Sequence, residues 1–206
     1  MSEIEVGLSK FIEFTIKQGP AKLSVVRDVK YQTEYSPATD YWKKLREGIV
    51  EMHRNGYSSE YLDHIVESVT DKKKHQYAKA VDEYKKLFKK HEIDFFEPGK
   101  AFWAYEDIIV KANPELGLYI NGEPHLIKLY LRDDDSRFDK WTTTSVCTLL
   151  ANSTYSQHFN FENAAYSVVH VKKGKQFSLL KGLVKADNIL TLQGEAAHFI
   201  DLYKKI

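Results

Sequence analysis

The chain has 206 residues, of which 43% are hydrophobic and 29% are charged, and this is the composition of an ordinary globular domain. Its 30 basic and 29 acidic residues leave a net charge of +1, so bulk charge does not favour a polyanionic partner. The single cysteine, Cys147, excludes an internal disulfide framework, and no apolar run is long enough to cross a membrane, so we expect a cytoplasmic protein.

The N-terminal portion, residues 1–94, shows the three- and four-residue apolar spacing of helices. Gly19-Pro20 and Asn55-Gly56 interrupt this spacing and indicate helix ends. Residues 22–35 alternate loosely and fit either a strand or a short helix. Helices are expected over residues 4–17, 40–54, 59–69 and about 71–88.

The helix that begins near Asp71 is the only strongly basic element. Tyr77, Tyr84 and Phe88 form its apolar stripe, which predicts a face buried in the core. Lysines fill most other positions and would neutralise phosphate charge, although a solvated amphipathic helix has the same pattern. The candidate nucleic-acid-binding residues are Lys72, Lys73, Lys79, Lys86 and Lys90.

A β-hairpin is the clearest structural signal in the chain. Asn121-Gly122 between two alternating apolar runs is typical of a two-residue type I′ turn. This turn sets the register, so Leu118 should face His125 and Glu115 should face Lys128. Because side chains alternate along a strand, His125 is expected among apolar residues, and Glu115 and Lys128 should share the other face.

The C-terminal portion, residues 95–206, is expected to be an α/β core. A strand over 102–110 precedes the hairpin and would complete an antiparallel meander of three strands. The later elements are a helix over about 136–151, strands over 164–171 and 176–180 with a turn at Lys172-Lys173-Gly174-Lys175 between them, and a last helix over about 187–204. The predicted fold class is therefore α+β, with N-terminal helices followed by an antiparallel β-meander with covering helices, in one compact unit.

The expected order from residue 71 to residue 171 is helix, three-strand meander, helix and strand. Pro114-Glu115 lies at the start of one hairpin strand, and Leu126-Ile127-Lys128 lies on the other. This arrangement resembles the core of the PD-(D/E)XK nuclease superfamily, in which strand-borne acids and a lysine act on nucleic acid. The resemblance implies that Glu115 and Lys128 are catalytic, that Glu115 binds a metal ion, and that Lys128 stabilises negative charge at phosphorus.

Leu126 stands where the family has its second acid, so the pattern is degenerate. Mg²⁺, the cofactor that the resemblance implies, usually takes one or two carboxylates besides phosphate oxygens. Glu106, on the preceding predicted strand, would supply the second metal ligand, with Asp107 as the next candidate. The alternative is that Glu115 and Lys128 form an ordinary cross-strand ion pair, in which case the sequence implies no cofactor.

Three further side chains are candidates for a site. Glu195 and His198 are three residues apart and would share a helix face, but one such pair does not make a metal centre, so we expect His198 on a helix surface. Cys147 is expected to be a small buried apolar residue. The sequence also lacks the glycine-rich phosphate loop and the zinc-protease helix motif.

Two functions fit these observations. The first is a degenerate nuclease-like domain that binds nucleic acid, with catalysis the less favoured outcome. The second is a non-catalytic protein-interaction or regulatory module, whose surface would be the aromatic-rich segment Phe95–Tyr105 or the basic helix. In the first case Glu106, Glu115 and Lys128 should converge in a cleft with the basic helix on its rim, and in the second the pair should lie on an open face.

Overall fold

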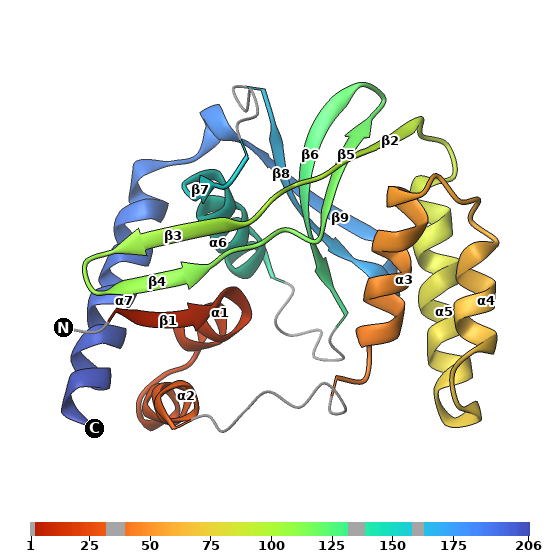
Figure 1. Ribbon diagram of the computed structural model, residues 1–206. Helices are drawn as coiled ribbons and strands as arrows, with labels where there is room; N and C mark the ends of the chain where they lie inside the picture. The colour runs from red at the N-terminus through yellow and green to blue at the C-terminus, as the bar shows by residue number, and fades with distance from the viewer. Residues whose placement is uncertain (1–2, 32–39, 132–138, 158–162) are drawn as a thin grey trace.

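The computed structural model describes residues 3–31, 40–131, 139–157 and 163–206, and these form two β-sheets with helices around them (Figure 1). The first sheet has the strand order β1 (Ile4–Gly7), β4 (Ile108–Lys111), β3 (Ala101–Tyr105) and β7 (Thr154–Tyr155). The second has the order β2 (Ile93–Phe96), β5 (Leu116–Ile120), β6 (Glu123–Tyr130), β8 (Ala165–His170) and β9 (Lys175–Leu180). The pairs β1–β4 and β6–β8 are parallel, and the other pairs are antiparallel.

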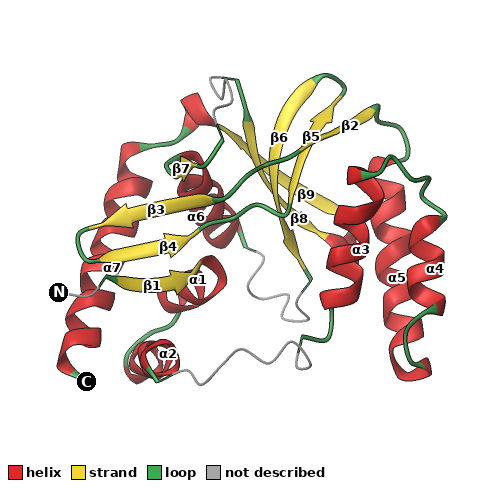
Figure 2. Cartoon of the chain, viewed as in Figure 1, coloured by secondary structure: helices red, strands yellow, loops and turns green. Residues whose placement is uncertain are grey.

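The helices fall into two groups that belong to two separate hydrophobic cores (Figure 2). One core contains α1 (Leu8–Ile16), α2 (Pro20–Lys30), α6 (Lys140–Ala151) and α7 (Ala186–Lys205). The other contains α3 (Lys43–Arg54), α4 (Tyr61–Glu67) and α5 (Asp71–Phe88). Two short 3₁₀ helices, η3 (Val171–Lys173) and η4 (Lys181–Leu183), flank β9.

The five-stranded sheet separates the two cores because its side chains alternate between faces. On β6, Leu126 packs with the α1, α2, α6 and α7 core, whereas Ile127 and Leu129 pack with the α3, α4 and α5 core. Both faces are covered in the middle of β6, where Leu126 and Ile127 are each 0% exposed and face different cores.

The predicted hairpin is confirmed in its turn and its register. Asn121 and Gly122 both have positive φ, at 52° and 85°, as a type I′ turn requires. Leu118 pairs with His125, and the backbone N–H of Glu115 donates to the carbonyl of Ile127 at 2.9 Å. The α+β fold class is also confirmed.

The predicted third strand over residues 102–110 is wrong. This stretch forms two strands, β3 and β4, which pair with each other around a turn at Glu106 and Asp107 and belong to the four-stranded sheet. Glu106 has φ 46°, the positive value that ends an extended run. The strand that pairs with β5 is instead β2, so the antiparallel meander is β2, β5 and β6.

The N-terminal portion is less purely helical than its spacing predicts. Residues 4–7 form β1, which pairs in parallel with β4, and the helix begins only at Leu8. Within the ambiguous stretch, residues 22–30 belong to a helix, α2, with Pro20 at its first position, where a missing N–H has no cost, and residues 32–35 lie outside the described part of the chain. No helix in the described part of the chain has both the length and the apolar character that a membrane crossing requires.

Candidate functional site

The Glu115–Lys128 pair lies where β5 begins, beside the second half of β6. The ammonium of Lys128 donates to Glu115 Oε1 at 2.5 Å and to the carbonyl of Asn113 at 3.1 Å. The other carboxylate oxygen, Oε2, accepts from the backbone N–H of Leu129 at 2.8 Å. The two side chains are 18% and 20% exposed, so the predicted pair forms and is held in a partly buried setting.

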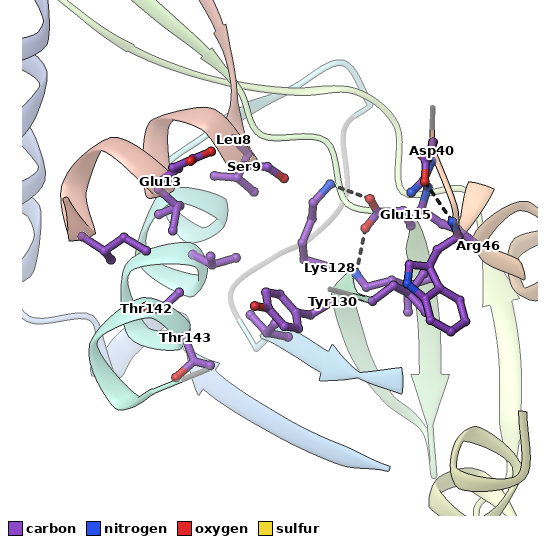
Figure 3. Close-up of a pocket in the computed structure, with 17 residues that line it drawn as sticks. Leu8, Ser9, Glu13, Asp40, Arg46, Glu115, Lys128, Tyr130, Thr142 and Thr143 are labelled. Atoms are coloured by element: carbon purple, nitrogen blue, oxygen red, sulfur yellow. Dashed lines mark hydrogen bonds and ion pairs between the residues drawn. The ribbon is translucent and has the colours of Figure 1, made fainter. Parts of the chain in front are cut away.

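A cavity of about 430 Å³ opens beside this pair (Figure 3). Its walls come from α1, from the C-terminal end of β6, from the first turns of α6 and from the segment that leads into α3. Apolar side chains such as Ile12 and Val146 make much of the wall, and a few polar groups interrupt them. Cavities of this size and character are typical of small-ligand sites.

Most of the charged side chains that line the cavity form ion pairs with one another. Three carboxylates, Glu13, Asp40 and Glu115, line it together with two cations, Arg46 and Lys128. Arg46 Nη2 lies 2.6 Å from Asp40 Oδ2, in a second ion pair like that of Glu115 and Lys128. The lining residues therefore carry no excess of positive charge, and the cavity by itself is not built to attract phosphate.

The first turn of α6 brings two threonines to the cavity with different hydrogen bonding. Asp139 caps the helix by accepting from the backbone N–H of Thr142 at 2.7 Å. The hydroxyl of Thr143 donates to the carbonyl of Asp139 at 2.9 Å. The hydroxyl of Thr142 is buried and has no hydrogen-bond partner among the described residues. Thr142 is therefore a lining residue whose hydroxyl is buried and makes no hydrogen bond within the described residues.

The two predicted metal-binding acids are not brought together. Glu106 is exposed at the tip of the β3–β4 hairpin, at the end of β4 remote from Glu115, and in the other sheet. Asp107 accepts from Lys204 of α7 at 2.5 Å, and this bond holds the pKa of its carboxyl below the usual range. Within the described ranges no group of three His, Cys, Asp or Glu side chains is arranged to hold a metal ion.

The basic helix α5 covers the face of the five-stranded sheet opposite α6, so it does not form a rim above the Glu115–Lys128 pair. Lys73 lies 4.6 Å from the ring centroid of Tyr41, and Lys86 pairs with Glu83 at 2.6 Å. Lys72, Lys79 and Lys90 are exposed. As predicted, Tyr77, Tyr84 and Phe88 pack against the core on the other side of the helix.

A basic group that the sequence analysis treated only as a turn lies next to α5. Lys172 and Lys173 belong to η3, and Lys175 begins β9. The ammonium of Lys172 lies 5.6 Å from the ring centroid of Trp42, and Trp42 in turn lines the cavity. The run Lys-Lys-Gly-Lys at residues 172–175 was the available sequence signal, but only the fold places it beside another basic element.

The other titratable candidates have structural roles. His125 is buried and hydrogen-bonds to Ser167 Oγ at 3.0 Å, and burial lowers its pKa. Cys147 is fully buried, which raises the pKa of its thiol to about 12 and leaves no reactive thiolate. Glu195 pairs with Lys22, and His198 lies exposed on α7, as predicted.

The aromatic-rich segment 95–105 is partly buried. Ala101 and Trp103 are buried in the core, and the ring of Phe96 lies directly over Gly117 of the neighbouring strand. The rings of Phe95, Phe96 and Tyr105 pack partly against the two cores and remain partly exposed, so the segment keeps some accessible aromatic surface.

The chain matches no protein-family model, and no curated protein resembles it in sequence.

Proposed function

We propose that this protein is a nucleic-acid-binding domain of nuclease-like architecture that does not cleave its ligand. The order α5, β2, β5, β6, α6 and β8 is a helix, an antiparallel meander, a helix and a returning strand. The returning strand β8 is parallel to β6, and α6 connects the two. This arrangement supports the resemblance to the PD-(D/E)XK core, although fold resemblance alone does not establish function.

The observation that carries the proposal is the position of the Glu115–Lys128 pair at a cavity. The pair lies at the wall of a hollow formed by the C-terminal end of β6 and the first turn of α6. Ligands of α/β units bind at the carboxyl ends of parallel strands, where helix N-termini also point. A cross-strand ion pair that served only stability would have no need of such a cavity.

We expect no cleavage because the site offers too few carboxylate oxygens to bind a metal ion. Leu126, in the place of the second acid, is 0% exposed and packs in the core. Glu106 lies in the other sheet, and Glu115 already accepts from Lys128 and from a backbone N–H. One carboxylate that is engaged in this way does not fit Mg²⁺, which needs several oxygen ligands in near-octahedral geometry. No metal-dependent step is assigned to this site.

The test measures binding and cleavage on the same samples. Fluorescein-labelled DNA and RNA strands are titrated with protein at low salt, with and without Mg²⁺ or Mn²⁺, and are then run on a denaturing gel. We expect binding without cleavage. Glu115→Gln should strengthen binding and Lys128→Gln should weaken it, each by up to about tenfold, because each changes one charge beside the ligand's phosphates.

The matched control is Glu5→Gln, which removes the carboxylate partner of Lys111 in the other sheet and should leave binding unchanged. Failure of the wild-type protein to bind either nucleic acid at low salt would overturn the proposal. Metal-dependent cleavage that is lost in Glu115→Gln would overturn its non-catalytic part.

A further inference from the structure

We infer that the phosphate backbone of the bound nucleic acid lies on a lysine cluster that three separate segments bring together. The cluster consists of Lys79 on α5, Lys172 and Lys173 in η3, and Lys175 at the start of β9. This inference rests on the proposed function and identifies the surface that would hold the strand. It adds residues that lie far from α5 in the sequence and outside the Glu115–Lys128 cavity.

Close packing of the η3–β9 turn against α5 assembles the cluster. Gly174 has φ 55°, and a Cβ atom added there would lie 2.7 Å from the carbonyl oxygen of Glu83 on α5. The turn therefore approaches the helix backbone more closely than a residue with a side chain would allow. This contact brings the lysines on either side of Gly174 next to the exposed face of α5.

The lysines of the cluster place several positive charges close together. Burial and the positive charges of Lys79 and Lys173 lower the pKa of Lys172. Lys79 and Lys175 are exposed, and neither forms an ion pair within the described part of the chain. The neighbouring carboxylate, Glu83, pairs with Lys86 at 2.6 Å. Mutual repulsion of this kind costs stability in the free protein, and a polyanion would relieve it.

The cluster also adjoins the candidate site. Lys172 lies over the ring of Trp42, and Trp42 lines the cavity beside Arg46 and its partner Asp40. The ring of Trp42 therefore connects the cluster to the cavity wall. Because the cavity lining carries no excess positive charge, the lysines of the cluster would supply the contacts to phosphate.

The experiment compares salt dependence in two matched triple variants. The test variant, K172Q/K173Q/K175Q, removes three charges from the cluster. The control variant, K100Q/K181Q/K185Q, removes three exposed charges that form no ion pair within the described residues. Binding of labelled single strands of DNA and of RNA is measured by anisotropy from about 50 to about 200 mM salt. Circular dichroism checks that both variants fold.

Each phosphate contact contributes about 0.7 to the slope of log affinity against log salt for a single strand. Loss of three contacts should therefore reduce the slope by about 2, with weaker binding at every salt concentration, while the control keeps the wild-type slope. Wild-type slope and affinity in the test variant would overturn this inference alone. An equal loss in both variants would also overturn it, and no binding by the wild type would overturn the proposed function as well.

Discussion

The two adjacent threonines at the start of α6 allow a sharp test of the cavity. Thr142→Val and Thr143→Val make the same chemical change, one residue apart in the same helical turn. Valine and threonine have the same branched shape and similar helix propensities, so the two variants differ mainly in the hydroxyl that each removes. Only the hydroxyl of Thr143 is hydrogen-bonded within the described residues, at 2.9 Å to Asp139 and 3.2 Å to Lys140.

The expected changes in the free energy of unfolding have opposite signs. A buried hydroxyl without a partner costs about 1–3 kcal/mol, so Thr142→Val should stabilise the protein by about 1 kcal/mol. A hydrogen bond that is made contributes about 1 kcal/mol, so Thr143→Val should destabilise it by about that amount. The two variants should therefore differ by about 2 kcal/mol in unfolding free energy.

Urea unfolding, followed by circular dichroism, measures this difference directly. With an m value near 2 kcal/mol/M, the midpoints of the two variants should lie about 1 M apart. Destabilisation of the Thr142→Val protein by 1 kcal/mol or more would refute the reasoning. It would mean that the hydroxyl has a partner in the cavity, either ordered water or a bound ligand, and that the cavity wall is polar at this point.

Three further measurements test other parts of the structure. Lys128→Met should destabilise the protein by about 2–4 kcal/mol in urea unfolding, and Glu115→Gln by less, because the glutamine amide oxygen can still accept a hydrogen bond from Lys128 or from the backbone N–H of Leu129. Burial lowers the pKa of His53 from 6.5 to about 4, so up to about 3 kcal/mol of stability present above pH 6.5 should be lost as the pH falls towards 4. His53→Gln should remove that part of the pH dependence, and an unchanged profile would contradict the assignment. A Cβ atom on Gly117 would lie 2.5 Å from a backbone oxygen of β2, so Gly117→Ala should lower the melting temperature, whereas Gly194→Ala, with open space on α7, should raise it slightly.

The parts of the fold that local chemistry determines could be predicted from the sequence. Asn121-Gly122 is one of the few dipeptides that readily takes positive φ at both positions, so the hairpin and its register follow from it. The apolar stripe of α5 likewise predicts which of its residues are buried, because helix periodicity and burial are directly linked. Glu115 and Lys128 were placed opposite each other by counting from the same turn.

The parts that depend on long-range pairing could not be predicted. Residues 102–110 are apolar enough for one strand, and the pair Glu106-Asp107 is not a typical two-residue turn, so nothing local indicates that the chain reverses there. Ile4 and Val6 alternate as a strand does, but four residues are too few to separate this pattern from the helix that follows. The pairing of β1 with β4, more than a hundred residues away, decides the outcome.

The cavity could not be predicted from the sequence, for a related reason. Its polar groups come from α1, from residues 40–46, from β6 and from α6, and these segments are spread over more than 130 residues of the sequence without a fixed spacing. Motif analysis finds residues that lie close together along the chain or at a fixed spacing, so it found Glu115 and Lys128 but not Glu13 or Thr142. The lysines of η3 were recognised as a turn, since only the packing of Gly174 on α5 gives them a basic neighbour.

Three consecutive residues of β6 explain where the sequence departs from the PD-(D/E)XK pattern that it resembles. Ile127 faces the α3, α4 and α5 core, while Leu126 and Lys128 share the opposite face of the sheet. Leu126 is enclosed between strands and helices of the other core, where a carboxylate would lose its hydration without gaining a partner. Lys128, two residues nearer the end of the strand, lines the cavity and donates a hydrogen bond to Glu115. The enclosure of position 126 therefore favours leucine there, and the one acid and one lysine that remain fit the proposed binding without cleavage.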